Sequence, residues 1–459
     1  MSQQSSTSSR VTRRAFVVRT LATTGALGLV PLAGSAAALG MRASAGGARQ
    51  GANDSVGVGV IGAGIRGEIL IRATKSIPGT RIVGVADIYD GHFARSKEIL
   101  GDGIVVTRDY KQLLDHKDIQ AIVIVTPDHW HKTMALEAMA AGKDVYIEKP
   151  MTHSWQEGEA IIAAAAKHRR IVQVGSQWSS MPGNARAMEI LKSGRLGTIT
   201  LINGGFNRNT GTGAWYYPVP PDASASTIDW PRFIGPAKAR PFDAERFFRW
   251  RLYWDYSGGL PTDLFVHLIT ATHTLTGVTM PSKVMGIGGI YRWKDREVPD
   301  QMSAVIQYPE GFTLNLTATA NNGHPQPPLT IMGTEGTLEY YANRLVLHSE
   351  PMLENYTYST NHFPAAQKDQ FAVNQSLDRA TMRPKATATT KLAPPEEIKI
   401  EGGDATVPHM AAFYDSVRTR KEPFQNALMG HQCATVGHMV NISHRNGTLV
   451  KWDGKRVVG

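Results

Sequence analysis

The sequence predicts an α/β protein in which a doubly wound parallel sheet is followed by an α+β domain with an open, mostly antiparallel sheet. A glycine-rich turn near residue 62 lies between a β-branched run and a helical segment. Buried-type strands then alternate with helical segments up to about residue 175. Beyond residue 198, β-type runs follow one another with few helical segments between them. The 459 residues suffice for two domains and a sizeable core.

The composition is that of an ordinary globular protein. Apolar residues make up 42% of the chain and charged residues 19%. The formal net charge is +10, partly from arginines in the first 20 residues, and no dense basic run interleaved with aromatics supports nucleic-acid binding. The single cysteine, Cys433, excludes an internal disulfide and, without a Cys/His cluster at ligand spacing, a thiolate zinc site.

Residues 1–38 have the order of a secretory signal peptide. The pair Arg13-Arg14 precedes a modest apolar stretch, and small residues at 36–38 form a candidate cleavage site. The paired arginines resemble a twin-arginine (Tat) signal, and the alternative is a membrane anchor. The stretch is too short and too rich in glycine and threonine for the roughly 20 residues of a spanning helix, so no permanent membrane span is expected.

This signal predicts a periplasmic or otherwise exported protein. Its partner would be the twin-arginine export machinery, and residues 39–55 would be a linker of small residues. The twin-arginine route moves folded proteins, many of which take up a cofactor before export. A bound cofactor is therefore expected.

The first strand, over residues 56–61, leads into a G-x-G-x-x-G turn and a helix. Gly62 suits the tight turn, Gly64 permits a pyrophosphate to approach the backbone, and Gly67 permits the helix to pack on the strand. The residues predicted to bind the cofactor here are Gly62, Ala63, Gly64, Ile65, Arg66 and Gly67. The pattern predicts a Rossmann-type domain over residues 56–175.

The second strand, over residues 81–86, ends in Asp87, 20 residues after Gly67. A carboxylate at this point accepts a hydrogen bond from the ribose 2′-hydroxyl and repels a 2′-phosphate, so the expected cofactor is NAD rather than NADP. The alternative is that Asp87 only caps a helix. The order of strand, glycines, helix, strand and acid favours the NAD site.

Two further strands end in polar motifs at the edge of the sheet where ligands of doubly wound folds bind. The further residues expected at the cofactor are Thr126, Pro127, His131, Glu148 and Lys149. Lys149 at a strand end beside the cofactor can hold a substrate oxygen and stabilise developing negative charge, and the alternative is a solvated lysine.

The segment His129-Trp130-His131 contains two histidines that could suggest a metal site. No carboxylate or third histidine is placed to complete it, so no metal is expected. His131 is interpreted as lining the pocket or belonging to the core.

The order of these motifs resembles the glucose-fructose oxidoreductase and inositol dehydrogenase family, Gfo/Idh/MocA, over roughly residues 56–457. In that family the lysine of Glu-Lys-Pro reaches the nicotinamide and the substrate hydroxyl, and a cis bond often precedes the proline. The resemblance implies these roles for Lys149 and Pro150.

The β-type runs after residue 198 predict a second α+β domain over residues 176–405, used for substrate binding and oligomerisation, and the family has an open sheet there. Residues 342–405 are rich in proline, threonine and alanine, which is typical of a long surface excursion. Residues 406–459 contain helical segments that the resemblance implies pack back on the first domain. The resemblance also implies a homo-oligomer, paired through the outer face of the open sheet.

An insertion over residues 207–258 is dense in aromatic residues. Such residues suit a sugar-binding cleft, a loop that packs its own core, or a subunit interface, and the sequence leaves these three open. Substrate contacts are predicted for Trp250, Arg251 and Tyr253.

Asp263 and His267 are four residues apart at the start of a predicted helix, so they share one face. The family carries an Asp-x-x-x-His here, which implies that His267 is the acid/base for the reacting hydroxyl and that Asp263 supports it. A neutral histidine can take the alcohol proton while hydride leaves for NAD. The alternative is a capping aspartate with a core histidine. With Lys149 they are the candidate catalytic and substrate-binding residues.

The predicted function is that of an NAD-dependent oxidoreductase acting on a secondary hydroxyl of a sugar, sugar acid or cyclitol, with NAD retained through turnover because the periplasm has no general NAD pool. One alternative is an NAD-dependent glycoside hydrolase, whose cycle is redox-neutral, although relatives with that chemistry depart from Glu-Lys-Pro. Another is a catalytically silent sugar-binding protein.

Overall fold

The computed structural model describes residues 55–350, 361–374 and 393–459. The predicted signal peptide and nearly all of the predicted linker lie outside these residues. No helix within the described ranges has the length and apolar character needed to cross a bilayer.

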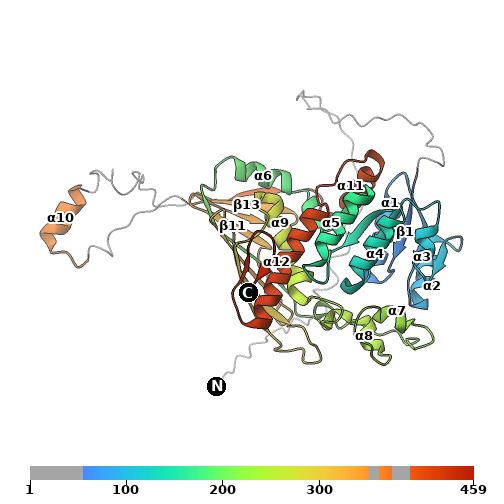
Figure 1. Cartoon of the computed structure of the whole chain (residues 1–459). Coiled ribbons are helices and arrows are strands. Elements are labelled where there is room, and N and C mark those ends of the chain that lie inside the picture. Colours follow the sequence, from blue (N-terminus) through green and yellow to red (C-terminus); the bar gives the residue numbers. More distant parts are fainter. Residues whose placement is uncertain (1–54, 351–360, 375–392) are drawn as a thin grey trace, which may run out of the picture. The chain divides into compact units, whose positions relative to one another are not determined.

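The first sheet is parallel and has the strand order β3-β2-β1-β4-β5-β6 (Figure 1). Its elements are β1 (Val56–Ile61), α1 (Ile65–Ser76), β2 (Thr80–Ala86), α2 (Asp90–Leu100), β3 (Val105–Thr107), α3 (Lys111–Asp115), β4 (Ala121–Ile124), α4 (Asp128–Ala140), β5 (Asp144–Glu148), α5 (Glu157–His168) and β6 (Val172–Gly175). Every residue of β1 is buried, as expected for a strand that helices cover on both faces. The strand order reverses between β1 and β4, and ligands of such folds bind at this point.

The second sheet has ten strands in the order β14-β13-β12-β11-β7-β10-β9-β8-β15-β16. They are β7 (Ile199–Asn207), β8 (Lys283–Gly289), β9 (Gln301–Gln307), β10 (Thr313–Thr319), β11 (Leu329–Gly333), β12 (Gly336–Tyr340), β13 (Arg344–Ser349), β14 (Glu396–Lys399), β15 (Val450–Trp452) and β16 (Val457–Val458). Only the β7–β10 pair is parallel among the strand pairs of the described sheet. The predicted fold class, a Rossmann-type sheet plus an α+β domain with a mostly antiparallel sheet, is confirmed.

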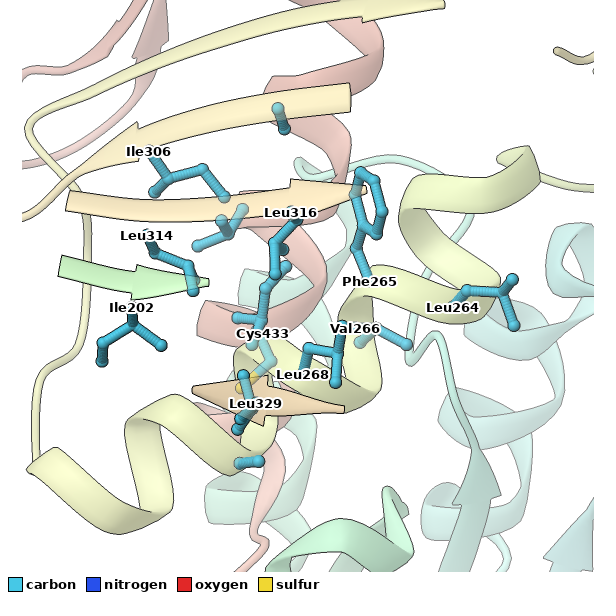
Figure 2. Packing of buried hydrophobic residues seen from close by; sticks show 14 of the residues in the cluster. Ile202, Leu264, Phe265, Val266, Leu268, Ile306, Leu314, Leu316, Leu329 and Cys433 are labelled. Carbon is cyan, nitrogen blue, oxygen red and sulfur yellow. The ribbon is translucent and has the colours of Figure 1, made fainter. Parts of the chain in front are cut away.

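One face of the second sheet packs on α6 (Asn184–Lys192), α9 (Val266–Thr276) and α12 (Ala427–Asn446). Alternate residues of the strands are buried against these helices, which is the period of two expected of a sheet with one covered face. Figure 2 shows part of this core, in which Leu314 and Leu316 of β10 lie near Leu268 of α9 and Cys433 of α12.

The prediction that residues 342–405 form a surface excursion is wrong for two of its segments. Strands β13 and β14 pair with each other and extend the sheet beyond β12. Leu345 and Leu347 are buried at alternate positions of β13, which is the pattern of a strand. The pattern is short, and the proline-rich composition of the whole region favoured a loop in the prediction. The same region contains α10 (Ala365–Asn374), and residues 351–360 and 375–392 lie outside the described residues.

The aromatic insertion between β7 and β8 packs a small core of its own. Its short helical elements are η3 (Thr212–Ala214), α7 (Trp230–Ile234), α8 (Ala244–Phe248), η4 (Trp250–Leu252) and the π-helical turn η5 (Pro261–Phe265). Trp230 stacks on Phe233 with ring centroids 5.1 Å apart, and Phe247 and Tyr256 complete the cluster. Tyr89, which follows strand β2, belongs to the same cluster, so the insertion is packed against the first sheet.

The C-terminal helices also contact the first sheet. Helix α11 (Thr406–Thr419) packs on α1, where the hydroxyls of Tyr414 and Thr74 lie 2.8 Å apart. Helix α12 contacts β6 and α5 on one side and β8 and α9 on the other. It therefore holds the carboxyl edge of the first sheet beside the second sheet.

Candidate active site

A cavity of about 1040 Å³ lies at the carboxyl edge of the first sheet. It is lined by the glycine turn, the ends of β2, β4 and β5, parts of the aromatic insertion, and the turn that begins α9. Its volume is at the upper end of the range typical of small-molecule and cofactor sites.

The glycine turn leaves open backbone at the start of α1. Gly62 has a φ of +93°, and a Cβ there would lie 2.6 Å from the carbonyl oxygen of Val125. A Cβ at Gly64 would meet only the His92 ring, at 3.6 Å. No side chain caps α1, so its first N–H groups are open to an anion, and the turn fits the pyrophosphate of NAD.

Asp87 lies at the cavity, and its carboxylate is held by the backbone around it. It accepts hydrogen bonds from the N–H groups of Ala63 (2.6 Å), Ile88 (2.7 Å) and Tyr89 (3.0 Å). Burial acts to raise the pKa of Asp87, but His92, 3.0 Å away, and these hydrogen bonds hold the pKa below its usual value. The carboxylate is thus ionised at the cavity, and its backbone contacts show that it caps its own turn. Its predicted contact with the ribose of NAD stays a prediction.

Lys149 follows β5 and precedes a cis bond to Pro150. Its ammonium donates to the main-chain oxygen of Asp263 at 2.8 Å and forms an ion pair with the same residue's carboxylate. Arg251 reaches the other carboxylate oxygen of Asp263 at 3.2 Å. Burial acts to raise the pKa of Asp263, but the charges of Lys149 and Arg251 outweigh it and hold that pKa well below its ordinary value.

His267 lies one turn after Asp263 and lines the same cavity. Asp263 belongs to the π-helical turn η5 and His267 to α9, and such turns inside helices are frequent at functional sites. Burial, followed by the charge of Lys149, holds the pKa of His267 well below its ordinary value. Its Nδ1 is buried without a hydrogen-bond partner among the described residues. His267 is therefore a neutral imidazole able to accept a proton.

The structure brings Lys149, Asp263, His267, Trp250 and Arg251 to one end of the cavity. The remaining predicted cofactor residues that line it are Gly62, Gly64, Ile65, Arg66, Gly67, Asp87, Thr126, Pro127 and Glu148. Glu148 accepts hydrogen bonds from Arg66 at 2.8 Å and Gln177 at 3.1 Å, which ties the glycine turn to the strand that carries Lys149.

Three predicted contacts are not found in the cavity lining. His131 is fully buried. One of its ring nitrogens lies 2.7 Å from the carbonyl oxygen of Pro150, and the other lies 2.9 Å from the carbonyl oxygen of Thr126. His131 therefore contacts the backbone of both motifs without lining the cavity. Tyr253 lies under the guanidinium of Arg246, 3.7 Å from its ring centroid. Ala63 contributes its N–H to Asp87, and its side chain faces the core.

Sequence reasoning missed Asp128, Arg208 and Tyr217, which also line this cavity. Asp128 begins α4 and is 3% exposed. Burial and the nearby charge of Asp263 raise its pKa well above the ordinary value. Its place directly after Thr126-Pro127, at the ligand edge of the sheet, was the available signal. Arg208 and Tyr217 lie in the insertion. The sequence alone does not distinguish residues of the insertion that line the cavity from those that pack in its core.

Two family models match this chain. Residues 56–176 match the oxidoreductase family model with an NAD-binding Rossmann fold, and residues 236–339 match the GFO/IDH/MocA C-terminal domain. Residues 56–176 and 236–339 are therefore similar to the two domains of Gfo/Idh/MocA oxidoreductases. The first domain of this chain is thus an NAD-binding Rossmann domain. Within the described residues, no group of three or more His, Cys, Asp or Glu side chains could hold a metal ion.

Curated members of this family share part of the sequence. Inositol 2-dehydrogenase 1 of Saccharopolyspora erythraea is 31% identical over 174 residues, which is 38% of this chain and 51% of that protein. Inositol 2-dehydrogenase of Serratia proteamaculans is 33% identical over 151 residues, 32% of this chain and 45% of that protein. The chain spans about half the length of the curated relatives it matches.

Solved structures share the fold over most of the chain. Levoglucosan dehydrogenase in complex with NADH has a TM-score of 0.62 and 17% identity, covering 86% of this chain and 99% of that one. Aldose-aldose oxidoreductase from Caulobacter crescentus, complexed with glycerol, has a TM-score of 0.62 and 17% identity, covering 87% of this chain and all of that one. At this identity the likeness concerns the fold.

Proposed function

We propose that this protein oxidises or reduces a secondary hydroxyl position of a sugar, sugar acid or cyclitol with NAD. The observation that carries the proposal is the grouping of Lys149, Asp263 and His267 at one end of a cavity whose other walls include the NAD-binding turn. The inositol 2-dehydrogenases and levoglucosan dehydrogenase that resemble this chain act on polyhydroxylated rings, as their names state.

The three side chains can divide the work of such a reaction. NAD, when bound, supplies the hydride acceptor. Lys149 is positioned to hold the reacting oxygen and to stabilise its developing negative charge. His267, whose pKa is lowered by desolvation and by the charge of Lys149, takes the proton of the hydroxyl. Asp263 stays ionised and fixes the ammonium of Lys149 in place.

We also propose that the protein is exported by the twin-arginine route and keeps NAD through turnover. Contacts between the aromatic insertion and the first domain support retention. His129 Nε2 and Trp130 Nε1 lie 2.9 and 3.0 Å from the carbonyl oxygen of Phe233. On the other side of the insertion, the Tyr89 hydroxyl donates to Asp222 at 2.5 Å. The insertion, parts of which line the cavity, is thus bonded to the cofactor-binding domain at Asp222 and Phe233.

Two experiments test these proposals. The protein is purified from the periplasm without added nucleotide and denatured, and the released small molecules are identified by mass spectrometry. About one NAD or NADH per chain supports retention, and an empty protein contradicts it. The reaction is then tested by following reduction of bound NAD with myo-inositol, D-glucose and D-glucuronate. Absence of reduction with every polyol, by a protein that binds NAD, would contradict the proposed oxidoreductase.

A redox-neutral glycoside hydrolase is the second candidate because of Asp128. This buried carboxyl group lines the cavity, and its raised pKa favours the protonated form that could give a proton to a leaving oxygen. The cycle oxidises a ring hydroxyl, eliminates the aglycone, adds water and returns the hydride to the sugar. Release of nitrophenol from aryl glycosides, abolished in Asp128→Asn, would favour this candidate over a simple oxidoreductase.

A further inference from the structure

Arg208 carries a guanidinium group into the cavity without a partner. It directly follows β7, and its N–H donates to the carbonyl oxygen of Thr319 at 2.8 Å, so its backbone is anchored to the second sheet. The side chain is half-buried and lines the cavity. No described residue forms a hydrogen bond or ion pair with its guanidinium. A guanidinium that lines a cavity and lacks a protein partner is available to bind an anionic ligand.

The surrounding charges leave Arg208 uncompensated. The carboxylate of Asp263 is shared between Lys149 and Arg251. Burial and the charge of Asp263 raise the pKa of Asp128 well above its ordinary value, which favours its uncharged form. Glu148, a further carboxylate of the lining, is paired with Arg66. None of these carboxyl groups forms an ion pair with Arg208 among the described residues.

Arg208 lies close enough to three other cavity-lining side chains for its charge to act on them. The charge of Arg208 acts on His267 and on Asp263. The hydroxyl of Tyr217 experiences the charges of Arg251, Asp263 and Arg208 together. Arg208 is therefore within reach of a substituent on the ring whose hydroxyl would meet Lys149 and His267.

We propose that the substrate is a sugar bearing a carboxylate or phosphate group, which Arg208 binds while Lys149 and His267 act on a ring hydroxyl. This inference rests on the proposed function, since it names the class of substrate for the same site. A guanidinium presents paired N–H donors that match the oxygens of a carboxylate or phosphate. Trp250, whose ring centroid lies 4.1 Å from the Arg251 guanidinium, also lines the cavity.

Equilibrium binding tests recognition of the anionic group independently of the redox reaction. D-Glucose, D-glucuronate and D-glucose 6-phosphate are titrated into the NADH-loaded full-length protein, and tryptophan fluorescence is followed because Trp215 and Trp250 line the cavity. At least one anionic sugar is expected to bind about tenfold or more tightly than D-glucose, as one charge-assisted contact provides. The stronger of the two ligands distinguishes a sugar acid from a sugar phosphate.

Variants of Arg208 assign the preference to this residue. Arg208→Gln is expected to remove most of the preference, and Arg208→Lys to keep part of it through its charge. Arg81→Gln is the matched control because it removes the same charge away from the cavity. Arg81 is exposed at the start of β2, at the opposite edge of the first sheet. Circular dichroism and the midpoint of thermal unfolding verify that each variant is folded.

The inference is overturned if D-glucose binds as tightly as both anionic sugars, or if Arg208→Gln and Arg81→Gln weaken anion binding equally. Its failure is distinguishable from failure of the proposed function. Arg208-dependent binding of D-glucuronate without any reduction of NAD would leave the anion site intact and contradict the oxidoreductase. Oxidation of D-glucose without tighter binding of either anionic sugar would support the oxidoreductase and contradict the anion site.

Discussion

The ammonium of Lys149 and the carboxylate of Asp263 form an ion pair that joins the end of strand β5 to the π-helical turn before α9. The pair therefore links the NAD-binding sheet to the helix that carries His267. Because Arg251 holds the second oxygen of Asp263, the carboxylate is fixed and does not compete for the substrate proton. In the proposed reaction, His267 is the residue that takes this proton.

Replacement of Lys149 by methionine tests its place beside the reacting oxygen. Lys149→Met removes the positive charge that would stabilise the developing oxyanion, and kcat is expected to fall by about 10²–10³-fold. NADH binding, measured by fluorescence, should change little because the glycine turn is intact. Lys283→Met, at an exposed lysine on β8, is the control for a lost lysine. A variant with near-normal kcat would remove Lys149 from the reaction.

The pH dependence of kcat/KM tests His267 as the base. Its pKa lies well below the ordinary 6.5, so it stays neutral as the pH falls through 6.5 and the acid limb of the profile is expected below that value. His267→Gln is expected to lower kcat by about 10²–10⁴-fold and to remove this limb. A limb centred at or above pH 6.5 that survives in His267→Gln would assign the base to another group.

Buried histidines are expected to make the protein acid-sensitive. Burial lowers the pKa of His273 to about 3, so below pH 6.5 the unfolded chain binds a proton that the folded chain does not. Stability is complete above the unfolded pKa and falls with pH, by about 2–3 kcal/mol per such histidine at pH 4.5. His131 and His438, whose pKa values are lowered by burial to about 4 and about 3, act in the same direction.

Urea unfolding at pH 7.5, 6.0 and 4.5 measures this loss. His273→Gln keeps a polar partner for the Tyr308 hydroxyl, 2.8 Å from the histidine ring, and should reduce the dependence of stability on pH. The exposed His324→Gln is the matched control. An equal dependence in the wild type and His273→Gln would contradict a neutral His273.

Much of the fold was predictable because its signals are local. The β-branched strand, the G-x-G-x-x-G turn and the helix after it lie within a single stretch, and so do Glu148-Lys149-Pro150 and Asp263-x-x-x-His267. Each motif also sits at a strand end or helix start, where the sheet's geometry dictates which way it faces. These positions required no knowledge of long-range packing.

The rest of the site depends on contacts between distant segments. Arg208 and Lys149 meet at one cavity only because β7 and β5 belong to sheets held together by α12. In the aromatic insertion, Trp250 lines the cavity whereas Tyr253, three residues later, lies under Arg246. The sequence composition does not distinguish these two aromatic residues, because their different positions result from tertiary packing.

Asp87 is expected to set the choice between NAD and NADP. Its ionised carboxylate lies at the cavity and would repel a 2′-phosphate. Asp87→Asn removes the charge and should narrow the ratio of the Kd values for NADPH and NADH by about tenfold or more. Asp87→Asn also weakens the contacts to Ala63 and Tyr89, which lowers the affinity for both cofactors. The ratio of the two Kd values cancels this common loss. An unchanged ratio would mean that Asp87 serves only to cap its turn.

The contacts of the aromatic insertion are expected to slow the release of NADH. Tyr89→Phe deletes only the hydroxyl that donates to Asp222, and Trp130→Phe deletes the N–H that donates to the oxygen of Phe233. A neutral hydrogen bond contributes about 1 kcal/mol and one to a carboxylate about 1.5–3 kcal/mol, so the dissociation rate should rise about fivefold in Trp130→Phe, about tenfold or more in Tyr89→Phe, and most in the double variant. Stopped-flow displacement of NADH by excess NAD measures the rate. Tyr291→Phe, at an exposed tyrosine, controls for the loss of a hydroxyl. If the double variant releases NADH at the wild-type rate, the insertion does not hold the cofactor and retention would have to come from the glycine turn alone.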